Sequence, residues 1–251
     1  MKRIISICFF ITCIAVKLNA QQFIEKATIE FEVKSNIQKT LGDGDWIEMI
    51  KDKLPTFKTS YYNFTFANNK SFYKLDRYDS KSLVIPEWLR RDDEENEWFI
   101  DYTTGMYQTK KSIEGSPLNI KDSLTNIEWK LINENMSIAD FNCRKAVGKI
   151  FDSVYVFVYY SEEIPISGGP CNVTGLPGMI MGMTIPRLFT SWIATKVNVV
   201  SVNESIIKPA SAKKIYHKKE FNNLLIDITK DWGWDEESKA RKARFVWNSF
   251  L

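Results

Sequence analysis

The sequence contains few of the residues on which most enzymes rely for acid–base or metal chemistry. It has 1 histidine in 251 residues, and it has no Gly-x-Ser-x-Gly elbow, Walker loop, His-Glu-x-x-His helix or Cys-x-x-Cys pair. A zinc site built from several histidines is therefore excluded, and a Ser-His-Asp triad would have to use His217. The sequence also lacks internal repeats and low-complexity linkers, so a single domain is the simplest organisation.

The excess of basic residues is confined to the N-terminus. Lys2 and Arg3 precede an apolar run from residue 4 to residue 16, and residues 18–20 provide a small-residue cleavage site, as in a secretory signal peptide. Removing residues 1–20 takes away three basic residues, which reduces the 34 basic residues to 31 and equals the 31 acidic residues. A mature chain without net charge does not favour binding to nucleic acid.

The positions of the cysteines and the lengths of the apolar runs predict where in the cell the protein is located. No cysteine directly follows the predicted cleavage site, so the sequence predicts a soluble exported protein, periplasmic or secreted, and not a lipoprotein. No later stretch is apolar enough to span a membrane. In an oxidising compartment Cys143 and Cys171 are candidates for a disulfide, and two buried free thiols are the alternative.

Alternating apolar residues predict that residues 21–251 form one β-rich domain. Ile29, Phe31 and Val33 alternate with polar residues, and Asn68 with Asn69 separates two further alternating runs as a hairpin turn would. Because the few helical segments do not alternate with strands, we expect a single curved antiparallel sheet or an open barrel with flanking helices, including a C-terminal helix. Other strands are predicted at residues 97–102, 106–110, 127–131, 143–150, 154–160 and 192–202, and helices at 46–53, 221–228 and 236–250.

The segment from residue 168 to residue 184, GGPCNVTGLPGMIMGMT, concentrates glycine, proline and methionine. Gly168, Gly169 and Pro170 predict a tight turn, and Pro177 followed by Gly178 predicts a type II turn in which Gly178 has a positive φ. The methionines that follow are two residues apart and are expected on one face of a strand. Three thioethers suit Cu(I), whereas the same spacing fits a buried core strand. The candidate copper ligands are Met179, Met181 and Met183.

The same segment resembles the signature of the GLPGLI family, exported proteins of one group of Gram-negative bacteria. The resemblance covers about 40 residues and implies envelope export and a β-rich fold, without an assigned reaction. Met181 and Gly182 stand where family members often have leucine and an acidic residue, and Cys171 stands where other residue types are usual. The matching residues are Cys143, Lys145, Ala146, Ile164, Pro165, Gly169, Pro170, Gly175, Leu176, Pro177, Gly178, Met179 and Ile180.

Two charged segments are further candidate sites. His217 lies within a basic cluster, residues 213–219, for which a solvated face is the first interpretation and a surface for an anionic lipid headgroup or a partner is the second. The acidic run from Asp92 to Glu97 has the oxygen density of a Ca²⁺ site but not the spacing of an EF-hand loop. We expect that run to be a solvated loop.

These patterns favour a non-catalytic binding or accessory role in the cell envelope. A curved sheet would present an apolar concave face to a lipid, a peptide or an envelope protein, and no catalytic residue or cofactor is assigned. One alternative is a carboxylate-based hydrolytic enzyme, which needs two acids facing one cleft. The other is a periplasmic copper-binding protein that uses the three methionines. An accessible cavity lined by aromatic residues from several strands would favour the binding role.

Overall fold

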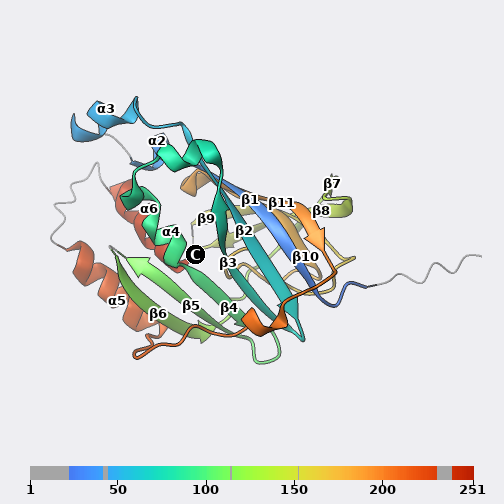
Figure 1. Cartoon of the computed structure of the whole chain (residues 1–251). Coiled ribbons are helices and arrows are strands. Elements are labelled where there is room, and N and C mark those ends of the chain that lie inside the picture. The colour runs from blue at the N-terminus through green and yellow to red at the C-terminus, as the bar shows by residue number, and fades with distance from the viewer. Residues whose placement is uncertain (1–22, 42–44, 114, 152, 231–238) are drawn as a thin grey trace, which may run out of the picture.

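The computed structural model describes residues 23–41, 45–113, 115–151, 153–230 and 239–251, so the predicted signal peptide lies outside the described residues. Eleven antiparallel strands form one open, curved sheet in the order β6-β5-β4-β3-β2-β1-β11-β10-β9-β8-β7, which confirms the predicted fold class (Figure 1). The strands are β1 (Ala27–Asn36), β2 (Phe57–Ala67), β3 (Lys70–Tyr78), β4 (Glu97–Asp101), β5 (Met106–Ile113), β6 (Ser116–Ser123), β7 (Lys130–Ile138), β8 (Phe141–Ile150), β9 (Val154–Ser161), β10 (Met179–Ile185) and β11 (Thr190–Asn198).

Two-residue hairpin turns connect β2 to β3 in the middle of the sheet and β7 to β8 at one end of it. Asn68 and Asn69 have φ of 52° and 56°, and they connect β2 to β3 as a two-residue turn with left-handed backbone at both central positions. Asparagine adopts this conformation at low cost, which is why the predicted hairpin forms here. Ala139 and Asp140, with φ of 48° and 68°, make the equivalent connection between β7 and β8.

Strand β6 was not predicted from the sequence. It begins with Ser116 and Pro117 and alternates only weakly, which is typical of an edge strand because proline cannot donate a ladder hydrogen bond. Tyr216 pairs with its outer edge: the Tyr216 N–H donates to the Asn119 carbonyl at 2.8 Å, and the Lys121 N–H donates to the Tyr216 carbonyl at 3.0 Å. This contact covers part of an otherwise free edge.

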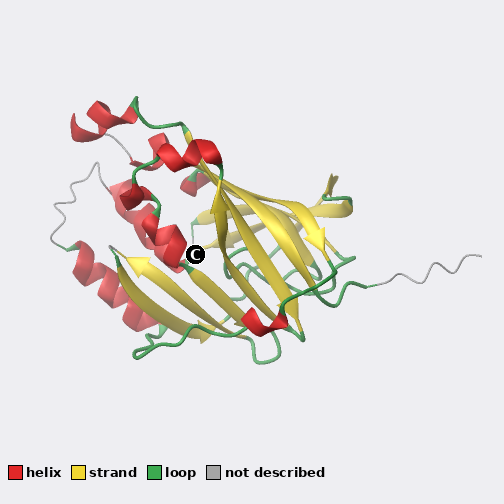
Figure 2. Ribbon diagram, in the orientation of Figure 1, coloured by secondary structure: helices red, strands yellow, loops and turns green. Residues whose placement is uncertain are grey.

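Helices gather on one side of the curved sheet (Figure 2). Phe221 and Leu225 of the first long helix are buried against Ile100, Tyr107 and Ile120 of β4 to β6. The C-terminal helix is confirmed, and the part of its predicted range before residue 239 lies outside the described residues. The helices are α2 (Ile37–Leu41), α3 (Asp45–Lys51), α4 (Arg91–Glu95), α5 (Lys218–Thr229) and α6 (Lys239–Phe250), with 3₁₀ turns at Ser80–Val84, Glu87–Leu89, Pro186–Leu188 and Glu204–Ile206.

The glycine- and proline-rich loop between β9 and β10 is buried inside the concave side of the sheet. A Cβ on Gly168 would lie 2.6 Å from the Tyr102 hydroxyl, and a Cβ on Gly178 would overlap the Ser161 carbonyl oxygen. Glycine is therefore required here by close approach. The type II turn prediction was wrong in its details, because the positive φ of this loop belongs to Gly175 (101°) and Cys171 (59°) and not to Gly178.

A bulge interrupts the regular alternation that was predicted for the three methionines. Met179 lies opposite Ser161 of β9 and Met183 lies opposite Val158, so a four-residue step in β10 matches a three-residue step in β9. The bulge lies at Met181. All three side chains are buried in the main hydrophobic core, so the segment packs as core.

Candidate functional site

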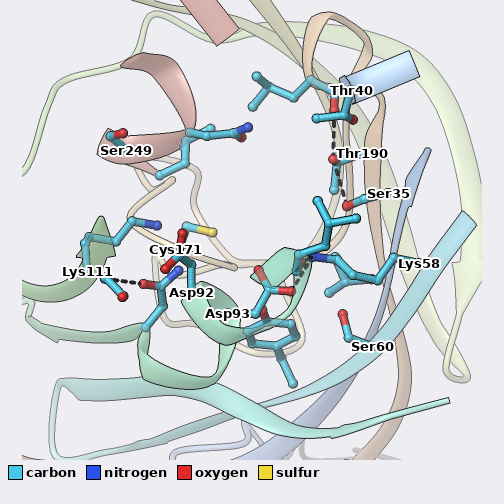
Figure 3. A pocket seen from close by; sticks show the side chains of 18 of the residues that line it. Ser35, Thr40, Lys58, Ser60, Asp92, Asp93, Lys111, Cys171, Thr190 and Ser249 are labelled. Atoms are coloured by element: carbon cyan, nitrogen blue, oxygen red, sulfur yellow. Dashed lines mark hydrogen bonds and ion pairs between the residues drawn. The ribbon is translucent and has the colours of Figure 1, made fainter. Parts of the chain in front are cut away.

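A cavity of about 400 Å³ lies between the concave face of the sheet and the helices α2, α4 and α6 (Figure 3). One wall is aromatic, because the inward positions of four strands carry Tyr62, Tyr73, Trp98 and Trp192. The Tyr62 and Tyr73 rings stack with centroids 4.9 Å apart, and the Tyr73 and Trp98 centroids are 5.2 Å apart. The volume lies in the range of small-molecule sites, which are largely apolar with a few placed polar groups.

Lys111 is the deepest charged residue of the cavity. It shares the inward face of β5 with Tyr107 and Thr109, and only 6% of its surface is exposed. Its Nζ lies 4.7 Å from the centroid of the Trp98 ring, a cation–π contact. Among the described residues it forms no ion pair or hydrogen bond, and burial lowers the pKa of Lys111 below its usual value.

Helix α4 brings two carboxylates to the same cavity. Asp93 forms a short ion pair with Lys58 and accepts a hydrogen bond from the Tyr78 hydroxyl at 3.3 Å. Burial, followed by the charge of Asp93, raises the pKa of Tyr78. Asp92 also lines the cavity, and its Oδ1 is buried without a hydrogen-bond partner among the residues that the structure describes. The prediction of a solvated loop over this acidic run was therefore wrong: the run folds as a short helix because it packs against β5.

Cys171 brings a thiol to the cavity from the buried loop. Burial raises the pKa of Cys171 to about 12, and the nearby Lys111 ammonium opposes this rise. Cys143 lies in β8, and burial raises its pKa to about 11. Both cysteines are buried free thiols in the structure, so the predicted disulfide between them is not formed in it. Two neutral thiols are the protonation state that an apolar environment favours.

The end of the chain closes one side of the cavity. The Trp98 indole N–H donates a short hydrogen bond to the Leu251 carbonyl, and the Asn172 amide donates to the Phe250 carbonyl at 3.2 Å. Ser249 and Leu251 line the cavity. Helix α6 is therefore held to both β4 and the buried loop, and its position determines how open the cavity is.

The other sequence candidates lie away from this cavity or serve the fold. The His217 N–H donates to Glu220 Oε2 at 3.0 Å at the start of α5, so His217 begins a helix at the covered edge of β6. Of the family-like residues, Lys145 pairs with Glu134 at 2.7 Å on the surface, whereas Cys143 and Ala146 are core residues of β8. Gly169, Pro170 and Leu176 are buried in the loop, and Pro165, Gly175 and Pro177 are exposed there.

The described residues contain neither a cluster of metal ligands nor a helix that could span a membrane. Within the described ranges, no group of three or more histidine, cysteine or acidic residues has a geometry that could hold a metal ion. None of the helices in the described part of the chain combines the length and apolar character needed to cross a membrane.

Sequence reasoning missed Lys111, Asp92 and the aromatic wall. A signal for Lys111 was present: two consecutive lysines in a strand must point to opposite faces, so one of them had to share the face of Tyr107. The neighbouring Lys110 does point outward, where it pairs with Glu95 at 3.1 Å.

No protein-family model matches the sequence, and no curated protein matches it. Among solved structures, PNGF-II has a TM-score of 0.52 and 10% identity over 80% of this chain and 33% of its own chain. An uncharacterized conserved protein from Thermus thermophilus has a TM-score of 0.38 and 6% identity over 76% of this chain and 90% of its own. This chain thus spans about a third of PNGF-II, and at such low identity the likeness concerns the fold alone.

Proposed function

We propose that this protein binds a small amphipathic molecule in the cavity between the concave face of the sheet and helices α2, α4 and α6. The observation that supports this most directly is the aromatic wall contributed by four separate strands, around a volume of about 400 Å³. Aromatic faces provide apolar contact area, and the polar groups at Lys111 and Asp92 would orient the ligand.

We further propose that the protein is exported, that it binds its ligand without catalysing a reaction, and that it is of GLPGLI type. The signal-peptide pattern and the GLPGLI-like segment support it from the sequence. The buried loop supplies Cys171 to the cavity, which links that segment to the site. The copper-binding alternative loses support because Met179, Met181 and Met183 are all buried in the main hydrophobic core.

A carboxylate-based hydrolytic enzyme is the second candidate, because Asp92 and Asp93 both line the cavity. Binding without catalysis is preferred, since Asp93 is already engaged by Lys58 and Tyr78. A carboxylate held in this way orients its helix and is not free to act on a substrate.

Two measurements test the binding role. Native mass spectrometry of the protein purified from the cells that make it would detect a carried ligand as excess mass that disappears on unfolding. In parallel, the fluorescence of 1-anilinonaphthalene-8-sulfonate should rise on binding to the emptied protein.

A matched pair of variants locates the binding. Ser60→Phe places a ring on the cavity side of β2 and should abolish the fluorescence rise, whereas Thr59→Phe adds a ring on the opposite face of the strand and should preserve it. The absence of both excess mass and dye binding would refute the proposed function.

A further inference from the structure

The cavity contains one buried cation that has no anionic partner among the described residues. Lys111 is 6% exposed, and within the described part of the chain its ammonium forms a cation–π contact with Trp98 and no ion pair. In Figure 3 its nitrogen points into the cavity beside Cys171, and no dashed line joins it to an acidic side chain. Burying an ammonium group without an acceptor is costly, so a ligand that supplies an acceptor at this point would gain the full value of a charge-assisted hydrogen bond.

The same cavity contains a carboxylate oxygen without a donor among the described residues. Asp92 Oδ1 is buried, and no described residue donates a hydrogen bond to it. The two groups do not form an ion pair with each other in the structure. Asp93 and Lys58 already neutralise one another, so among the described side chains that line the cavity Lys111 and Asp92 are the charged groups left to face a ligand.

A ligand with a single charge would satisfy only one of these groups. An anion would pair with Lys111 and be repelled by Asp92, and a cation would pair with Asp92 and be repelled by Lys111. A zwitterion satisfies both, because its carboxylate accepts from the ammonium and its ammonium donates to the carboxylate.

We propose that the ligand is a free α-amino acid with an aromatic side chain, whose carboxylate binds Lys111 and whose amino group binds Asp92. This inference rests on the proposed function and names its ligand class. The aromatic ring would pack against the wall formed by Tyr62, Tyr73 and Trp98. The cavity of about 400 Å³ has room for such a molecule.

Isothermal titration calorimetry with three ligands of the same ring and chain tests the inference on the full chain. L-Phenylalanine carries both charges, 3-phenylpropanoate carries only the carboxylate, and phenethylamine carries only the ammonium. We expect L-phenylalanine to bind roughly tenfold or more tightly than either analogue, because each missing group forfeits a charged hydrogen bond.

Two variants assign the charges to residues. Lys111→Met should weaken L-phenylalanine and 3-phenylpropanoate by roughly tenfold without weakening phenethylamine, and Asp92→Asn should weaken L-phenylalanine and phenethylamine without weakening 3-phenylpropanoate. The controls are Lys110→Met, which removes the outward lysine of β5, and Glu94→Gln, which removes an exposed acid of α4. Both controls should bind all three ligands like the wild-type protein.

The outcomes separate this inference from the proposed function. Equal affinities for the three ligands in the wild-type protein would overturn the zwitterion assignment while leaving a general binding role intact. Binding of the fluorescent dye without binding of any of the three ligands would have the same meaning. Failure of the dye and of all three ligands, with no carried mass, would overturn both. The wild-type ligand series decides the question even where a variant fails to fold.

Discussion

The two ends of the curved sheet use their concave faces differently. From β8 to β10 and across to Phe64 of β2, the chain fills the concavity with its own loop, and the core residues there include Val156, Tyr160, Ile164 and Leu176. Where residues of β11 and of β1 to β5 line the cavity, helices α4 and α6 cover the concavity without filling it, and charged groups remain at its wall. The buried loop between β9 and β10 adds core contacts that stabilise the fold, whereas helices α4 and α6 leave volume for a ligand beneath them.

The largest predicted effect lies at the packed end. Phe64 is 0% exposed, and its ring centroid is 6.4 Å from that of Phe31 and 6.3 Å from that of Tyr73. Phe64→Ala should lower the free energy of unfolding by about 4 kcal/mol, because it removes apolar contact and leaves a cavity. Urea unfolding followed by tryptophan fluorescence measures this. Phe57→Ala is the control, because Phe57 is 51% exposed and should change stability by less than about 0.5 kcal/mol.

The close approach of the buried loop to β9 gives the next effect. Gly178→Ala places a Cβ against the Ser161 carbonyl and should cost about 3 kcal/mol, because backbone atoms must move on both sides. Gly105→Ala is the matched control, since no atom lies within 4 Å of its added Cβ and only its positive φ of 66° opposes the change. That control should cost about 1 kcal/mol. Equal losses of unfolding free energy in the two variants would contradict the close packing of this loop against β9.

At the cavity, a substitution is expected to raise the free energy of unfolding instead of lowering it. Burial lowers the pKa of Lys111, so its charged form is less favourable in the folded protein than in the unfolded chain, and this cost is present at low pH and is lost as the pH rises from the folded pKa toward the unfolded pKa. Lys111→Met should therefore raise the free energy of unfolding at pH 7 by about 1 kcal/mol. Lys110→Met should change it by less than about 0.5 kcal/mol. A loss of stability in Lys111→Met would show that the ammonium has a partner in the folded protein.

The smallest effect concerns Cys171 in alkaline solution. Its thiol pKa is raised from 9.0 to about 12 by burial, so below pH 9 the thiol is neutral in both states and stability does not depend on it. Between pH 9 and pH 12 the Cys171 thiol ionises only in the unfolded chain, and at about pH 10 this should lower the free energy of unfolding by about 1 kcal/mol. Buried tyrosines also titrate in this alkaline range. The measurement is therefore the difference between the wild-type protein and Cys171→Ala in how far the free energy of unfolding falls as the pH rises. Identical alkaline losses in the two proteins would contradict a buried neutral thiol.

Features decided by interactions within a few residues were predicted correctly, and features decided by tertiary packing were missed. Period-2 alternation located most strands, and Asn68 with Asn69 marked a hairpin, because both signals act within a few residues. Strand β6 and the bulge in β10 were missed, because an edge strand alternates weakly and a bulge shifts the register without changing the local composition. The acidic helix α4 was missed because its packing against β5 decides its structure.

By itself, the sequence determined the β-rich fold class and the hairpins, since these follow from local sterics and side-chain alternation, whereas glycine is needed in the loop between β9 and β10 because Tyr102 and Ser161 approach it closely in the fold. Only the tertiary structure decided that this loop fills one half of the concavity, and that Lys111 and Asp92 both line the cavity in the other half. The reason is physical: a cavity is defined by residues far apart in the chain, and no local pattern records which side chains lack a partner after folding.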